Sequence, residues 1–314
     1  MKKLLANKPV LIMFKVLVSI ALLSWLFSHT DIDWLKITNA VNHPSFWIGF
    51  ACIFMNILGQ AMRWVLALRI FGISISLRPS IHITFISQFF QVATVGALGG
   101  EAARSHYLRK EAQISISHAA AASVLDRVIG LFTMSFIGIV GALFLMIGAN
   151  LQDDTAMLLN ISFITFATLI AMALAGYFIL SRWSVFSSRY MIFFQQGIFY
   201  ISKLIQNPKR TFYLLLCSGV TNILVIIGLV QFANVLGTDI GMGASATMVP
   251  PIMISNSLPI SIGGLGVGEA SAEGVFSLLH YANGAASMFL VRICLWFLGL
   301  IGGFFFLFRS KIDP

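Results

Sequence analysis

Four charged residues in two similar surroundings are the strongest candidates for chemistry in this sequence. Glu101 ends the motif Val-Gly-Ala-Leu-Gly-Gly-Glu, and Glu269 ends the motif Ile-Gly-Gly-Leu-Gly-Val-Gly-Glu. Arg127 follows the first glutamate by 26 residues, and Arg292 follows the second by 23. Both arginines lie deep in apolar segments, where a charge costs about 2.5–3.5 kcal/mol on insertion scales. Such a cost requires a compensating acid or a bound anion such as a phosphate.

The glycines before each glutamate permit positive φ and close backbone approach, and we expect new helices at 101–112 and 269–281. Helix N-termini favour anions. Two interpretations stay open. The glutamates satisfy these N-termini and form buried ion pairs with the arginines, or the arginines present donors to an anionic ligand and the glutamates are counter-charges. The candidate binding residues are Arg127, Arg292, Glu101, Glu269, Gly99, Gly100, Gly263, Gly264, Asp126 and Arg104.

Two further charges lie near these candidates. Asp126 precedes Arg127, but neighbouring residues on a helix do not face each other. We therefore expect Arg127 to pair with Glu101, Glu269 or a ligand. Arg63 lies five residues from the end of its apolar segment, and we expect it to snorkel to the inner membrane surface.

The composition is that of an integral membrane protein. The 314 residues are 58% hydrophobic and 10% charged, include 28 Phe, and have a mean hydropathy of +0.92. A helical crossing needs about 20 apolar residues. We therefore predict an all-α polytopic protein with about six full spans, near Val10–Ser28, Ser45–Leu68, Ser117–Ile147, Ala156–Leu180, Thr211–Leu236 and Ala285–Phe308.

Two shorter segments, 80–98 and 244–262, are predicted to be re-entrant. Lys and Arg near span ends prefer the cytoplasm, so the lysines of residues 2–8 place the N-terminus inside. If segment 80–98 dips in and returns, the basic run 104–110 also stays inside. Segment 244–262 then enters from outside. The long span 45–68 then runs inward, whereas the long span 211–236 runs outward. These opposite directions predict two inverted repeats, and we expect the protein in a bacterial inner (plasma) membrane.

The predicted organisation has four parts: an N-terminal anchor span with its outer loop (1–44), repeat 1 (45–147), a linking span with an interfacial helix at 183–206 (148–210), and repeat 2 (211–314). Repeats with interrupted apolar segments indicate a transporter whose site lies between them. The pairs Gly138/Gly141 and Gly299/Gly302 suggest close helix contacts.

Three stretches resemble a known family. They are Thr94-Val-Gly-Ala-Leu-Gly-Gly-Glu-Ala-Ala-Arg104 with Tyr107–Lys110, Ser123–Gly130, and Leu258–Ala270. Together they resemble the lysylphosphatidylglycerol synthase transmembrane family, also called the flippase-like domain family, over nearly the whole chain. The resemblance implies movement of anionic or amino-acid-modified phospholipids, or of lipid-linked sugars, between leaflets. Family members often have Asp after the Gly-Gly pair and Arg before the second Glu, where this chain has Glu101 and Gly268.

Three functions stay open. The first is a lipid flippase or transporter whose central cavity binds a phosphate-bearing head group. The second is a membrane-embedded transferase acting on polyprenyl-phosphate sugars, with Asp31 and Asp33 as metal ligands. The third is a non-transporting partner subunit of a lipid-modifying enzyme. Size and the lack of a soluble aminoacyl-transferase domain favour the first, so we expect no enzyme, cofactor, metal or nucleic acid partner. The expected partner is an anionic lipid, and an oligomer is compatible with the sequence.

Overall fold

Helices suit long apolar stretches in a membrane because every backbone polar group is then bonded within its own segment. The computed structural model describes residues 34–93, 97–148, 160, 163–164, 167–168, 189–257, 261 and 264–309. This part of the chain contains helices and no strand. They are α2 (Trp34–Asn39), η1 (Ala40–Asn42), α3 (Pro44–Phe71), α4 (Leu77–Ala93), α5 (Ala97–Ala112), α6 (Ile116–Gly148), α8 (Arg189–Gln206), α9 (Pro208–Val235), α10 (Met242–Asn256), α11 (Val267–Leu278) and α12 (Gly284–Arg309).

Four described helices, α3, α6, α9 and α12, are long and apolar enough to cross a membrane. They coincide with four of the six predicted spans. The predicted spans 10–28 and 156–180 lie outside the described residues, apart from isolated positions of the second. The helices α4, α5, α10 and α11 have between 12 and 17 residues, fewer than the roughly 20 that a crossing needs.

The two central helices, α3 and α9, have matching start and stop signals. Pro44 and Pro208 occupy the first turn of each helix, where a missing backbone N–H costs nothing. Gly72, with a φ of 85°, ends α3, and Gly237, with a φ of 84°, follows the end of α9. Glycine adopts this left-handed conformation without a steric penalty.

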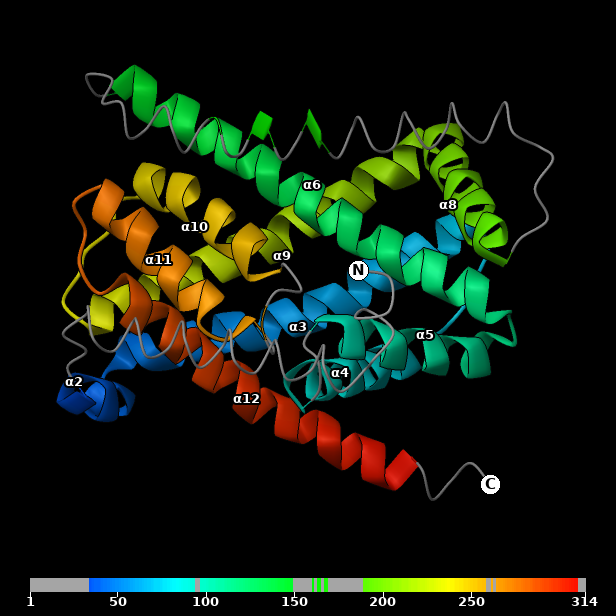
Figure 1. Ribbon diagram of the computed structural model, residues 1–314, viewed down its shortest axis with the longest axis horizontal. Coiled ribbons are helices and arrows are strands. Elements are labelled where there is room, and N and C mark those ends of the chain that lie inside the picture. Colours follow the sequence, from blue (N-terminus) through cyan, green and yellow to red (C-terminus); the bar gives the residue numbers. More distant parts are fainter. Residues whose placement is uncertain are drawn as a thin grey trace, which may run out of the picture.

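Each half of the described chain has the same order of a long helix, two short helices and a long helix. One short helix of each half packs on a long helix of the other half: α4 packs along α12, and α10 packs along α6. The other two short helices stay in their own half, α5 against α4 and α6, and α11 against α10 and α12, while the long helices α3 and α9 pack along each other. Figure 1 shows α3 and α9 running in opposite directions, as do α6 and α12. One helix of each helical hairpin therefore packs across the boundary and interlocks the two halves.

Glycine residues allow close contacts where α4 packs on α12 and α10 packs on α6. A Cβ added at Gly302 of α12 would overlap the Phe85 carbonyl of α4, and one added at Gly141 of α6 would lie 2.7 Å from the backbone of Ala246 on α10. The predicted close contacts at Gly141 and Gly302 are thus confirmed. Small residues at such positions let helix backbones approach each other in membranes.

A polar layer divides the apolar interior along α3. Ile53 and Ile57 belong to one buried apolar cluster, and Trp64 and Leu68 belong to a second. Between them, α3 places Asn56, Gln60 and Arg63 at spacings of four and three residues, on one helix face. Across from this face, α9 places Ser218, Thr221 and Asn222, which are all buried. Buried polar groups need partners, and their partners define the site.

The predicted interfacial helix is described from Arg189 onward, as α8. Its Tyr200 is buried and stacks on Phe71 of α3 at 4.4 Å between ring centroids. This contact attaches α8 to the end of α3.

Candidate functional site

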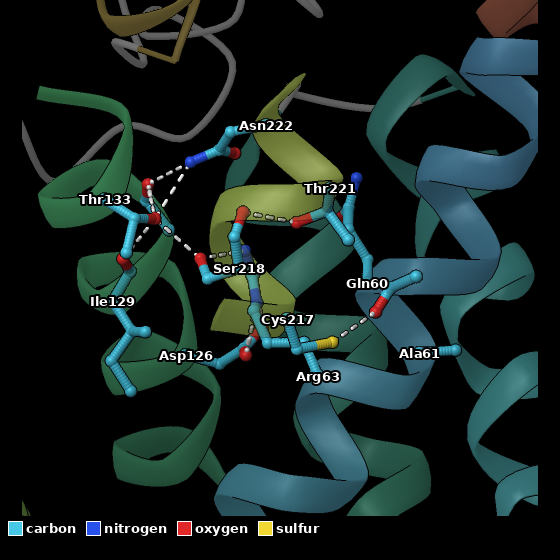
Figure 2. Close-up of polar contacts among 12 residues, drawn as sticks. Gln60, Ala61, Arg63, Asp126, Ile129, Thr133, Cys217, Ser218, Thr221 and Asn222 are labelled. Carbon is cyan, nitrogen blue, oxygen red and sulfur yellow. Dashed lines mark hydrogen bonds and ion pairs between the residues drawn. The ribbon is translucent and has the colours of Figure 1, made fainter. Parts of the chain in front are cut away.

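The polar layer joins three helices through a continuous hydrogen-bond network. Asn56 donates to the Thr221 carbonyl at 2.7 Å, which ties α3 to α9. The hydroxyls of Thr133 on α6 and Ser218 on α9 lie 2.6 Å apart, and Asn222 donates to Thr133 at 2.9 Å. Figure 2 shows Thr133, Ser218 and Asn222 converging between α6 and α9, with Arg63 and Asp126 below them in this view.

Asp126 is the acidic centre of this layer. It is fully buried and accepts hydrogen bonds from Arg63 Nε, Arg63 Nη2 and Arg104 Nη1, each at 3.0 Å. Arg63 therefore does not snorkel to the membrane surface as predicted, because this bidentate pair holds it inside the protein. A Cβ added at Gly130 would lie 2.9 Å from Arg63 Nη1, so only glycine leaves room for the guanidinium on that side.

Arg104 has hydrogen-bonding capacity that the described part of the chain does not satisfy. Its side chain is 6% exposed, and its guanidinium carbon lies 4.1 Å from the centre of the Trp64 ring. Its Nε and Nη2 atoms are buried with no acceptor among the described residues. A buried donor left without an acceptor costs about 1–3 kcal/mol, and more when the group is charged. The guanidinium is thus able to donate to a ligand.

Arg127 pairs with Glu101, one of the three partners left open by the sequence, through Nη2 and Oε1 at 3.4 Å. This pair is partly open: the arginine side chain is 30% exposed and the glutamate side chain 16%. The second carboxylate oxygen, Oε2, is buried without a donor among the described residues. The pair therefore leaves both a donor group and an acceptor atom available.

These groups line a cavity of about 210 Å³ between the two halves. Its polar lining comes from five helices and from Ser257, which follows the end of α10: Asn56, Gln60, Arg63, Thr84, Ser87, Gln88, Gln91, Glu101, Arg104, Asp126, Arg127, Asn222 and Ser257. Three arginines face two acids, so the cavity has a surplus of one positive charge when both acids are ionised. The lining is suited to an anionic ligand.

The first glycine motif differs from the predicted arrangement. Helix α5 starts at Ala97, four residues earlier than the predicted start at Glu101, so Gly99 and Gly100 lie inside its first turn. Gly100 contacts α4: its carbonyl accepts from Ser87 Oγ at 2.9 Å, and an added Cβ would lie 2.9 Å from the Ser87 carbonyl. The glycines serve close helix packing here, which a helical position allows.

The second motif builds a closed ion pair. Arg292 contacts both carboxylate oxygens of Glu269 and donates from Nη2 to the Gly264 carbonyl at 2.9 Å and to Asn256 at 3.2 Å. Glu269 also accepts from the Gly266 N–H at 2.8 Å, forming the N-terminal cap of α11. The arginine side chain is 4% exposed and the glutamate side chain 0%. Gly263 lies outside the described residues.

Glycine is also required around this second pair. Gly264 has a φ of 77°, and a Cβ there would overlap the Asn256 amide. A Cβ at Gly268 would lie 2.9 Å from Arg292 Nη2. The predicted positive φ and close approach are confirmed at Gly264.

A second cavity of about 260 Å³ lies next to this pair. Arg292, Asn256 and Trp296 line it, together with Gln88 and Gln91. The same two glutamines line the first cavity. The last turns of α4 therefore separate two cavities, each lined by one of the predicted arginines.

Sequence reasoning missed the α3 and α9 contributions, Asn56, Gln60, Asn222 and the inward position of Arg63. A signal was present, because residues 56, 60 and 63 repeat at helical spacing within an apolar span. Asp31 and Asp33, the metal ligands of the transferase hypothesis, lie outside the described residues.

A family model described as the lysylphosphatidylglycerol synthase TM region matches residues 12–303. No curated protein and no solved structure matches the chain.

Proposed function

Because the chain belongs to the lysylphosphatidylglycerol synthase TM region family, we propose that it moves an anionic phospholipid or lipid-linked sugar between membrane leaflets. The family description concerns a transmembrane region and not a catalytic domain. The proposed role is therefore transport without chemical change. The cavity between the two halves is the proposed head-group site, and the lipid tails stay in the bilayer.

The observation that supports this proposal most directly is the state of Arg104. Its guanidinium is buried at the cavity, and two of its nitrogens, Nε and Nη2, have no acceptor in the described chain. Phosphate oxygens are suitable acceptors because guanidinium donates to them in a planar fork. Arg127, partly exposed on the same cavity, supplies a second cation.

The remaining lining adds a requirement for the head group. Glu101 Oε2 and Thr84 Oγ1 are buried without partners in the described chain, and both face the cavity. A carboxylate oxygen can only accept a hydrogen bond. The proposed substrate therefore offers a hydroxyl or amino group beside its phosphate, as glycerol, amine and sugar head groups do.

The arrangement of helices supports two inverted repeats with re-entrant hairpins. The equivalent helices α3 and α9 run in opposite directions, and the hairpins α4–α5 and α10–α11 lie toward opposite ends of the molecule (Figure 1). In transporters, inverted repeats of this kind allow the protein to alternate between a conformation open to one side of the membrane and a conformation open to the other. The basic N-terminal residues place that end in the cytoplasm in this proposal.

The shared glutamines suggest a route for the head group. Gln88 and Gln91 line both cavities, so a head group passing from Arg127 toward Arg292 meets amide groups at the boundary. Amides both donate and accept hydrogen bonds. They would therefore replace the hydrogen bonds to water that the head group loses along this path.

The test is lipid movement in proteoliposomes containing the purified full chain. Fluorescent phosphatidylglycerol, phosphatidylethanolamine, phosphatidylcholine and a polyprenyl-phosphate sugar are each scored for exposure to a quencher. We expect movement of at least one anionic lipid. Arg104→Gln is expected to slow it by about tenfold or more, since a charged hydrogen bond contributes about 1.5–3 kcal/mol.

The matched control is Arg109→Gln, on the same helix but exposed and outside the cavity. It is expected to transport at the wild-type rate. Asp126 keeps its bidentate partner Arg63 in the Arg104 variant, so folding should persist. Equal rates for both variants, or no movement of any lipid in the panel, would contradict the proposed function.

A further inference from the structure

A third cavity lies away from the two described above, where α3 ends and α9 begins. Its volume is about 550 Å³, and its lining includes Leu66, Arg69, Ile70, Ile73, Arg210 and Tyr213. None of its lining residues belongs to either central cavity. Its chemistry therefore needs a separate explanation.

The turn after α3 builds an apolar floor for this cavity. Gly72 adopts a φ of 85°, and Ile73 folds back so that its N–H donates to the Leu68 carbonyl at 2.8 Å. As a result Ile70 and Ile73 are both buried. Leu66 extends this floor along α3.

The rim of the cavity is cationic. Arg69 comes from the last turn of α3 and Arg210 from the first turn of α9, and both are exposed. Within the described residues neither has an acid within ion-pair distance. Tyr213 adds an exposed aromatic ring with a hydroxyl. Tyrosine and arginine at helix ends are typical of the membrane–water boundary.

We propose that this cavity binds one anionic phospholipid of the surrounding membrane. The lipid phosphate lies between Arg69 and Arg210, and the glycerol and first methylenes cover Leu66, Ile70 and Ile73. Basic pockets between membrane helices bind anionic head groups in this way. An aqueous phosphate would use only the arginines, whereas a lipid also contacts the partly buried Leu66 beside them, so the combination of floor and rim favours a lipid.

Such a lipid would connect the two central helices. It contacts the end of α3 and the start of α9, and these helices hold Asn56, Arg63 and Asn222 in the polar layer. A ligand that binds only the native state stabilises that state. The expected effect is a higher melting temperature in the presence of the lipid, independent of whether the central cavity transports anything.

The test uses the delipidated full chain in detergent. Melting temperature is measured with added phosphatidylglycerol, phosphatidylcholine or soluble glycerol phosphate, and tightly bound lipids are counted by native mass spectrometry. Phosphatidylglycerol alone is expected to raise the melting temperature. The double variant R69Q/R210Q should show about half that rise or less, because both charged contacts to the phosphate are removed.

Two further variants make the result specific. The control R78Q/K209Q removes two exposed charges that do not line the cavity, and it should behave as wild type. Leu66→Trp keeps both arginines but fills the apolar floor, and it should lose the bound lipid. Retention of the full rise by R69Q/R210Q or by Leu66→Trp would overturn the proposal. So would an equal loss in the control, or an equal rise with glycerol phosphate.

Discussion

The two glutamate–arginine pairs occupy matching places in the two halves and differ in openness. The Glu101–Arg127 pair is partly exposed, with a single contact at 3.4 Å. The Glu269–Arg292 pair is buried, with contacts to both carboxylate oxygens and to a backbone carbonyl. The first pair is thus suited to exchanging partners with a ligand, and the second to holding the backbone of α11 and its preceding turn.

This difference predicts opposite consequences for the two arginines. Arg292→Gln leaves Glu269 buried without its partner and should destabilise the protein by about 3–5 kcal/mol. Arg127→Gln, at a partly exposed pair, should cost less than about 1 kcal/mol. Melting temperatures of the two purified variants provide the measurement.

A double variant separates the ion pair from other effects. E269Q/R292Q removes the stranded charge, while glutamine still caps the α11 N-terminus. It should recover much of the stability lost in Arg292→Gln. If the double variant is no more stable than the single one, the loss does not come from an unpaired glutamate.

The sequence limited the partners of Arg127 to Glu101, Glu269 or a ligand, because few acids are available to a charge in an apolar span. The structure shows that the partner is Glu101. The sequence was insufficient for Arg63, whose depth was judged from the expected end of its span at residue 68. Helix α3 extends to Phe71 and is continued by a buried turn, so Arg63 lies two turns from the end. Depth within a folded protein depends on neighbouring elements that a single segment does not reveal.

At the scale of elements, the contacts of α12 with α4 and of α6 with α10 depend on Gly302 and Gly141. Gly302→Ala places a methyl group against the Phe85 carbonyl, and overpacking of this kind typically costs about 1–3 kcal/mol. We expect a lower melting temperature for Gly302→Ala and a similar loss for Gly141→Ala.

Gly219→Ala in α9 is the matched control, since an added Cβ there meets nothing within 4 Å. It should leave stability unchanged or raise it by up to about 1 kcal/mol, as alanine favours helices over glycine. Equal melting temperatures for Gly302→Ala and Gly219→Ala would show that α12 has room to move away from α4.

Periodicity and glycine spacing predicted where the helices lie and which glycines make contacts, but not which helices meet. The order of long and short helices follows from the lengths of apolar stretches. The pairing of α4 with α12 and of α10 with α6 depends on shape complementarity between surfaces far apart in sequence. This pairing cannot be predicted from the residue pattern of a single sequence.

The whole molecule is proposed to present its two hairpins to opposite sides of the membrane. In a chain whose three cysteines are replaced by alanine, His106→Cys on α5 and Ser277→Cys on α11 introduce labels at exposed positions. A membrane-impermeant thiol reagent added to intact cells should label only Ser277→Cys. After the cells are opened, both should react. Labelling of both positions in intact cells would contradict the inverted arrangement.

The packing of α4 on α12, across the two halves, also constrains how the protein is synthesised. The ribosome delivers α4 and α5 early and α12 last, so α4 waits through most of translation before its partner reaches the membrane. During that interval the polar residues of α4, among them Gln88 and Gln91, are without the residues of the second half that line the same cavity. Contacts between residues distant in sequence form late and slowly. A nascent chain stalled before Gly284 is consequently an incomplete assembly that membrane quality-control proteases would recognise. The two halves synthesised as separate polypeptides should nevertheless associate in the membrane and form the same assembly as the full-length protein.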